Sequence, residues 1–342
     1  MRILIRLAML LTLFAARAGA IEPEKFLPPD TVFVGMVRPR QVMTSALAKS
    51  QGWDDLLKAK VATNGQAQEF LENVGLNPFT QIDSVLIAST VFPLLVNPTP
   101  EESTSFKPSY LVTFRGNFQS KRLIKALESL GKENGAPVKR IKVDDLILWE
   151  LPVPGAPVYV GIHNQQKAVF LANRKEDVIS CIRNGFGELK SKDLAAALTS
   201  LSGKESAWLA GTVTGKVRAN LALNPEFQAV ADQMEAWAIG ADLSDIVRLG
   251  LNLVARKGKP PEALKDALEK KLLPDLREKI AKTLESRAKY PEKADLGDRT
   301  LKAYQESLKS IQLTTSGRVI GLKFDLTGAL LDSIQGKEEK KP

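Results

Sequence analysis

The apolar residues change their period once within residues 109–130, and this change restricts the fold more than any other feature of the chain. Tyr110, Val112 and Phe114 point one way while Ser109, Thr113 and Arg115 point the other, which is typical of a strand with one buried face. After a break at Gly116, leucines recur at the spacing of one helical stripe from 123 to 130. The segment therefore predicts a strand, a turn and a helix.

Residues 247–272 follow the same order. Apolar residues alternate from Val247 to Leu253, a glycine and two prolines interrupt them, and leucines at helical spacing follow. The sequence LIKALE at 123–128 also aligns with LKDALE at 264–269. We expect an α+β fold in which antiparallel sheets carry helices packed on one face and in which an internal duplication has occurred.

The duplication predicts the organisation of the whole chain. We expect a signal peptide at 1–20, a first α+β repeat at 21–203, a second at 204–335 and a disordered charged tail at 336–342. The order expected within each half is strand, helix, strand, helix, hairpin, helix.

Several helices are predicted in the second half. One starts at Asn224 and runs through Trp237, with its apolar residues on one face and Gly240 after it. Two more, at 261–273 and 275–288, are separated by a proline. Their leucine stripe favours packing on a sheet, and the alternative is a position on a membrane surface.

The N-terminus has the features of an export signal. Arg2 and Arg6 precede an apolar run at 7–16, and residues 18–20 (AGA) match a small-residue cleavage site. A membrane-spanning helix needs about 20 apolar residues, more than this run supplies. We expect cleavage after Ala20 and a soluble periplasmic or extracellular chain without a transmembrane segment, with an uncleaved anchor as the alternative.

The net charge narrows the class of partner. The full chain carries a net charge of +9, and loss of the three arginines in residues 1–20 would reduce it to +6. Because the chain is expected outside the cytoplasm, we expect no nucleic-acid partner. The mild positive charge fits an anionic envelope surface better, and the partner stays open among an envelope protein, a glycan and a lipid. Cys181 is the only cysteine, so an internal disulfide is excluded.

His163 and Cys181 are the only residues of their types. His163 falls at the tip of a predicted hairpin, and the chain contains no G-x-S-x-G motif for a histidine-based triad. Cys181 lies on the apolar stripe of a predicted helix, where a free thiol usually packs as a small hydrophobe. A zinc site built from Cys and His needs three or four ligands, and the chain has one residue of each type. We therefore predict no metal site, and no stretch of the sequence predicts a cofactor.

Two short motif matches are incomplete. Ser129 and Lys132 match the S-x-x-K pairing of penicillin-binding proteins, but they end a predicted helix and lack the S-D-N and K-T-G partners. Residues 211–216 (GTVTGK) resemble a P-loop, but they are one residue short and lack the hydroxyl residue after Lys216. We interpret the second match as the end of a strand.

Paired carboxylates are interpreted as turn and cap residues, because they lack the spacing of a calcium loop. The pairs are Asp144 with Asp145, Asp242 with Asp245, and Asp295 with Asp298. Distant carboxylates could serve a glycosidase, but only 6% of the residues are aromatic, and such sites usually carry aromatic platforms.

Three motifs resemble those of a class of uncharacterised exported bacterial proteins. They are LPPDT at 27–31, GLNP at 75–78 with ID at 82–83, and FRGNF at 114–118. The mature chains of that class open with an LPxDT strand and carry a GLxPxxxID turn. The resemblance covers about residues 27–130, implies an exported, non-enzymatic α+β protein and transfers no catalytic residue.

The sequence favours an exported protein that serves as a non-catalytic binding or structural module of the cell envelope. No residue is assigned to catalysis, to a cofactor or to a metal. Two alternatives stay open. A hydrolase would use carboxylates or the pair Ser129 and Lys132, and would need two ionisable groups that meet in a cleft. A carrier of an apolar ligand would need a lined cavity between sheet and helices.

Overall fold

The computed structural model describes residues 23–326 except for 54, 56–58, 60–62, 64, 92–107, 134–137, 154–155, 166, 184, 289–304 and 306. The chain divides into two compact units. The first holds the residues up to 195 and 206–209, and the second holds 196–205 and the residues from 210 onward. The expected boundary after residue 203 lies where the units exchange segments. The expected signal peptide and charged tail lie outside the described residues.

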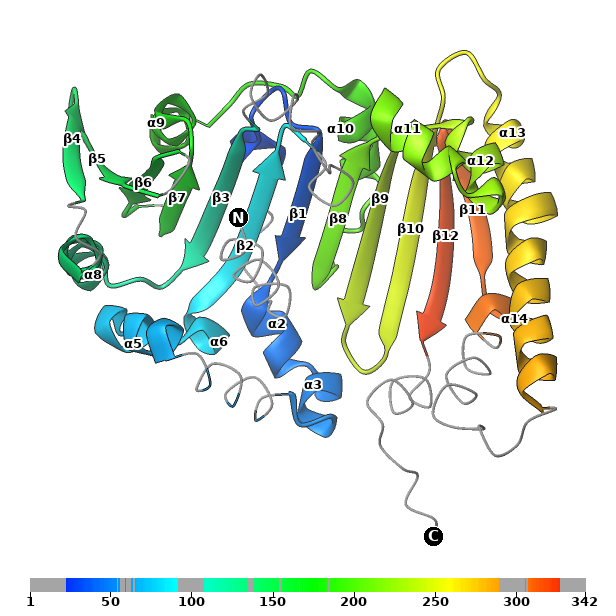
Figure 1. Ribbon diagram of the computed structural model, residues 1–342, viewed down its shortest axis with the longest axis horizontal. Coiled ribbons are helices and arrows are strands. Elements are labelled where there is room, and N and C mark those ends of the chain that lie inside the picture. The colour runs from blue at the N-terminus through cyan, green and yellow to red at the C-terminus, as the bar shows by residue number, and fades with distance from the viewer. Residues whose placement is uncertain are drawn as a thin grey trace, which may run out of the picture. The chain divides into compact units, whose positions relative to one another are not determined.

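The first unit contains an antiparallel sheet with the strand order β1-β2-β3-β7-β6-β5-β4 (Figure 1). Its elements in chain order are η1 (Pro23–Phe26), β1 (Phe33–Val37), α2 (Pro39–Thr44), α3 (Ala46–Ser50), α5 (Gly65–Val74), α6 (Pro78–Gln81), β2 (Ile82–Ser89), β3 (Tyr110–Gly116), α8 (Ser120–Glu133), β4 (Lys139–Val143), β5 (Leu146–Leu151), β6 (Val158–His163), β7 (Ala168–Ala172), α9 (Lys175–Arg183) and α10 (Lys192–Thr199).

The second unit also has an antiparallel sheet, with the order β11-β12-β10-β9-β8. Its further elements are β8 (Ala207–Thr212), α11 (Gly215–Ala222), α12 (Pro225–Ala231), β9 (Met234–Leu243), β10 (Val247–Ala255), α13 (Pro261–Ala267), η2 (Leu268–Leu272), α14 (Leu273–Ala288), β11 (Gln312–Ser316) and β12 (Val319–Leu326). The α10 and β8 elements each contain residues of both units.

The α+β class with antiparallel sheets is confirmed, and several predicted elements appear where expected. The hairpins β4–β5 and β11–β12 and the helix α9 occupy their predicted positions. Ser191 accepts a hydrogen bond from the Leu194 amide and caps α10, as predicted. Both segments with the strand–turn–helix pattern form a strand followed by a helix. Their origin in a duplication stays a prediction.

The helices of the first unit lie on both faces of its sheet, whereas the sequence favoured one face. A Cβ atom on Gly161 of β6 would lie 2.6 Å from Ile182 Cδ1, so α9 packs against this face. The next residue, Val160, points to the opposite face and belongs to a core cluster with Leu127 of α8. Both faces of the central strands are apolar, so helices pack on each face and shield it from water.

The predicted helix from Asn224 through Trp237 is wrong in its second half. The helix α12 ends at Ala231, and β9 begins at Met234. Met234, Ala236 and Ala238 are buried in alternation and pair with β10. Because apolar residues at every second position overlap with a helical stripe over a few residues, pairing with a distant strand decided the structure here.

The two helices predicted on either side of Pro274 form one helical run. A π-helical turn, η2, connects α13 to α14, and the Leu273 amide donates to the carbonyl oxygen of Leu268 five residues earlier. Proline has no amide hydrogen and is tolerated in the first turn of a helix. The wide turn directly before Pro274 lets the chain continue as a helix.

Candidate functional site

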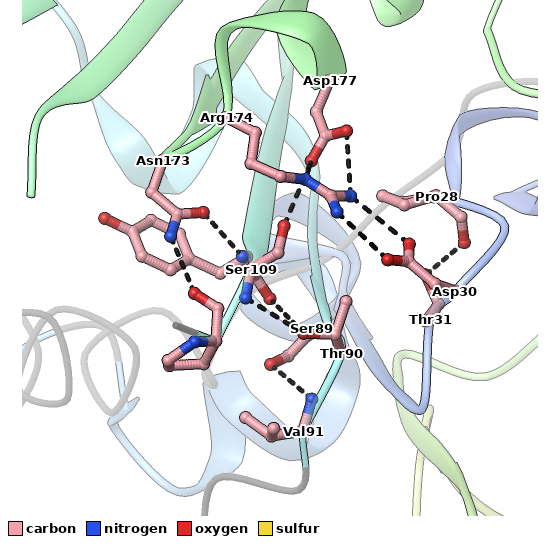
Figure 2. Close-up of polar contacts among 12 residues, drawn as sticks. Pro28, Asp30, Thr31, Ser89, Thr90, Val91, Ser109, Asn173, Arg174 and Asp177 are labelled. Atoms are coloured by element: carbon pink, nitrogen blue, oxygen red, sulfur yellow. Dashed lines mark hydrogen bonds and ion pairs between the residues drawn. The ribbon is translucent and has the colours of Figure 1, made fainter. Parts of the chain in front are cut away.

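A connected cluster of polar residues lies in the first unit, where three segments meet (Figure 2). The turn at 28–31 precedes β1, Ser109 precedes β3, and Arg174 precedes α9. The turn is closed by Thr31, whose amide and hydroxyl both donate to the carbonyl oxygen of Pro28, at 3.0 and 2.6 Å. This places Asp30 beside the start of α9. We call Asp30, Ser109, Arg174 and Asp177 the Arg174 cluster.

The Arg174 guanidinium binds two carboxylates at once. Its Nε and Nη2 donate to Asp177, at 2.8 Å to Oδ2 and 3.0 Å to Oδ1. Its Nη1 and Nη2 also donate to Asp30, at 3.1 Å to Oδ2 and 3.3 Å to Oδ1. Such paired bonds fix the guanidinium plane, which suits arginine better than lysine.

A second set of bonds ties the start of β3 to its neighbours. The Ser109 hydroxyl donates to Asp177 Oδ2 at 3.2 Å. Asn173 donates through Nδ2 to the Pro108 carbonyl at 2.7 Å and accepts from the Tyr110 amide at 3.0 Å. The Ser109 amide donates to the Thr90 hydroxyl at 3.0 Å. The ends of β2, β3 and β7 are therefore joined at one point.

Hydrogen bonds within the Arg174 cluster favour the charged forms of Asp30 and Arg174. Hydrogen bonds from Arg174 hold the pKa of Asp30 below its ordinary value, although burial opposes this. The hydrogen bonds that Arg174 donates to Asp177 and then to Asp30 raise the pKa of Arg174. The Asp177 side chain is only 7% exposed, while those of Asp30 and Arg174 are about 40% exposed. The buried Asp177 carboxylate therefore depends on hydrogen bonds from Arg174 and Ser109 to offset the cost of burying its charge.

This arrangement is suited to holding segments together. Ser109 and Asp177 form a hydroxyl–carboxylate pair, and both oxygens of this carboxylate also accept hydrogen bonds from Arg174. Activation of a serine needs a base that can take its proton. The cluster therefore fixes the start of α9 against the turn at 28–31.

Cys181 lies four residues after Asp177, about one turn further along α9, and is fully buried. Burial raises the pKa of its thiol, the Asp177 carboxylate raises it further, and Arg115 lowers it. A buried, protonated thiol is a poor nucleophile. The structure therefore gives Cys181 the packing position that the sequence predicted.

The other candidate residues lie in separate places. His163 ends β6 and pairs in register with Ala168 of β7. Ser129 is half-buried on α8, and the side chain of Lys132 lies outside those described. Residues 211–216 run from the end of β8 into α11, with Thr214 capping the helix. This agrees with the interpretation as a strand end.

The paired carboxylates occupy turns and ion pairs. Asp144 has a φ of 52° in the β4–β5 turn and pairs with Arg183. Asp242 and Asp245 both pair with Arg248, at 3.8 and 3.1 Å. Asp295 and Asp298 lie outside the described residues. Among the residues described, no group of three or more His, Cys, Asp or Glu side chains could hold a metal ion.

The sequence did not reveal the Arg174 cluster, because its members are far apart along the chain. Asp30 and Arg174 are separated by 144 residues, and Ser109 and Asp177 by 68. The signals present were Asp30 in a Pro-Pro-Asp turn and Asp177 in the first turn of a predicted helix, where acidic residues are favoured.

Comparison with known proteins assigns the chain to no family. No family model matches the chain, and no curated protein matches it. The solved structure of TP0453, crystal form I, aligns with 94% of this chain and 99% of its own length. The sequence identity is 9% and the TM-score is 0.43, a likeness too weak to indicate a function. No helix of the described residues is long and apolar enough to cross a membrane.

Proposed function

We propose that the protein is exported and serves as a non-catalytic binding or structural module of the cell envelope. The observation that carries the proposal is the closed Arg174 cluster. Arg174 makes four hydrogen bonds to two carboxylates. Catalytic sites instead keep a base or nucleophile with an altered pKa available to a substrate.

The buried thiol supports the same proposal. Cys181 is the chain's one cysteine, and burial keeps its thiol protonated inside the first unit. A reactive cysteine needs exposure and a cationic neighbourhood that lowers its pKa. Export is supported by the charged, apolar and small-residue segments at 1–20.

The export half of the proposal is tested by fractionation. The full chain and a chain lacking residues 2–20 are produced in a bacterium, and each is located by immunoblotting of envelope and cytoplasmic fractions. The proposal expects the full chain in the envelope fraction and the shortened chain in the cytoplasm. Equal distribution of the two chains would contradict it.

A further inference from the structure

Two large apolar side chains of the second unit are exposed where α11 meets α12. On α12, Val230 and Ala231 are 3% and 0% exposed, while Phe227, one turn earlier, is 36% exposed. Leu223, which directly follows the last residue of α11, is 81% exposed. We call Leu223 and Phe227 the α11–α12 tip.

The tip is held rigidly by the chain beneath it. Arg218 of α11 donates through Nε to the Ala231 carbonyl at 3.2 Å and through Nη2 to the Met234 carbonyl at 3.0 Å. Its Nη2 also lies 3.2 Å from Glu235 Oε2. The two short helices are thus fixed to the start of β9, and Leu223 is exposed at the end of a fixed support.

A cationic turn lies at the same end of the second unit. Arg256 Nε pairs at 3.3 Å with Glu235, the same carboxylate that Arg218 binds, and its amide donates to the Gln233 carbonyl at 2.6 Å. Lys257 and Lys259 follow and are exposed. Figure 1 shows α11 and α12 at the end of the strands from which the yellow loop to α13 emerges.

The 256–259 turn is itself well defined. The Lys259 amide donates to the Arg256 carbonyl at 3.1 Å, and Gly258 has a φ of 80°, which favours glycine. Cations outnumber carboxylates at this end of the unit. The cations are Lys216, Arg218, Arg256, Lys257, Lys259 and Arg318, and the described carboxylates are Asp232, Glu235 and Glu262.

We propose that the α11–α12 tip and the 256–259 turn form a docking surface for an anionic lipid bilayer. Leu223 and Phe227 enter the boundary between headgroups and acyl chains, and Lys257 and Lys259 face the anionic headgroups. An exposed apolar protrusion beside cations matches both properties of such an interface. Two side chains alone bind weakly and reversibly, so the binding needs both the apolar and the ionic contribution.

Sedimentation with vesicles tests this proposal. The purified protein is mixed with phosphatidylcholine vesicles that contain one-third phosphatidylglycerol and, separately, with pure phosphatidylcholine vesicles. We expect binding to the anionic vesicles only. The double substitution Leu223→Ser with Phe227→Ser should weaken the binding by about tenfold or more. Lys257→Gln with Lys259→Gln should weaken it by a similar factor, and added salt should do the same.

Matched control variants distinguish an effect of the α11–α12 tip from a general effect of losing apolar or cationic surface. Val153 is 39% exposed in the first unit, a fraction close to that of Phe227, so Val153→Ser removes an exposed apolar side chain elsewhere and should leave vesicle binding unchanged. Lys121→Gln with Lys125→Gln removes two exposed cations from α8 and should have no effect on vesicle binding. All variants keep the same N-terminus, so any binding through residues 1–20 is common to them.

The proposal is overturned if Leu223→Ser with Phe227→Ser binds as well as the parent protein, or if neutral and anionic vesicles bind equally. Leu223→Ser alone, at a position 81% exposed, keeps the test valid if the double variant loses its fold by circular dichroism. Vesicle binding does not depend on export, so this outcome is distinct from that of the fractionation experiment.

Discussion

Arg174 and Asp177 are joined by two hydrogen bonds of 2.8 and 3.0 Å, although only the arginine side chain reaches solvent. The same guanidinium binds Asp30, 144 residues away. One side chain thereby connects the entry to β1 with the start of α9. This relationship gives the first unit a polar anchor and leads to predictions about stability.

Arg174→Met should destabilise the protein by about 2 kcal/mol, because it leaves the buried Asp177 carboxylate with Ser109 as its remaining partner in the cluster. The partial exposure of Arg174 keeps the loss below that of a fully buried pair. Urea unfolding followed by circular dichroism measures it.

The matched control for this prediction is Arg183→Met. Arg183 pairs with Asp144, and their side chains are 46% and 72% exposed. Loss of a surface ion pair should cost less than about 1 kcal/mol. Equal losses for the two arginine variants would show that the Arg174 cluster does not anchor the fold.

Low pH should weaken the Arg174 cluster. Because Arg174 lowers the pKa of folded Asp30, the carboxylate stabilises the fold above its unfolded pKa of about 3.9. This contribution is lost as the pH falls through the lower folded pKa. The free energy of unfolding should therefore decrease more steeply below about pH 4 in the parent than in Asp30→Asn. Parallel profiles would contradict this prediction.

The Cys181 thiol should not react in the folded protein. Its full burial and its raised pKa predict no labelling by a thiol reagent at pH 8 in native buffer, and complete labelling in concentrated urea. Stability should also decrease as the pH rises above the unfolded thiol pKa of about 8.5, because only the unfolded chain ionises there. Rapid labelling of the native protein would place the thiol at the surface instead.

Gly161 should not tolerate a side chain. Gly161→Ala directs a methyl group into Val178 and Ile182 of α9, and this overpacking should cost about 1–3 kcal/mol. Gly250 in β10 is the matched control, because a Cβ atom there meets no atom within 4 Å. Thermal unfolding should show a lower midpoint for Gly161→Ala than for Gly250→Ala. The reverse order would be inconsistent with α9 packing on β6.

Local patterns predicted most strands, hairpins and caps, because alternation and helical stripes reflect burial within one element. The hairpin around Asp144 and the cap at Ser191 follow from such local rules. The segment from Met234 to Trp237 satisfies both a helical and a strand pattern over its few residues. Its structure depends on pairing with β10, which no local pattern contains.

The candidate site was harder to predict than the fold. Ser109 and Arg174 are ordinary polar residues at the ends of elements, and they become a cluster only when β3 and β7 pair. The exposure of Leu223 could not be predicted either, because a leucine next to a helix is usually interpreted as a core residue when only the sequence is known. Tertiary contacts decide both which polar side chains meet and which apolar side chains stay exposed.

The central claim is that this is an exported module, and the mass of the protein purified from an envelope fraction tests it most directly. Intact mass spectrometry under native and then denaturing conditions should give a chain that begins at Ile21. A chain that still begins at Met1 would contradict export by a cleaved signal, and with it the proposed place of the protein in the cell envelope.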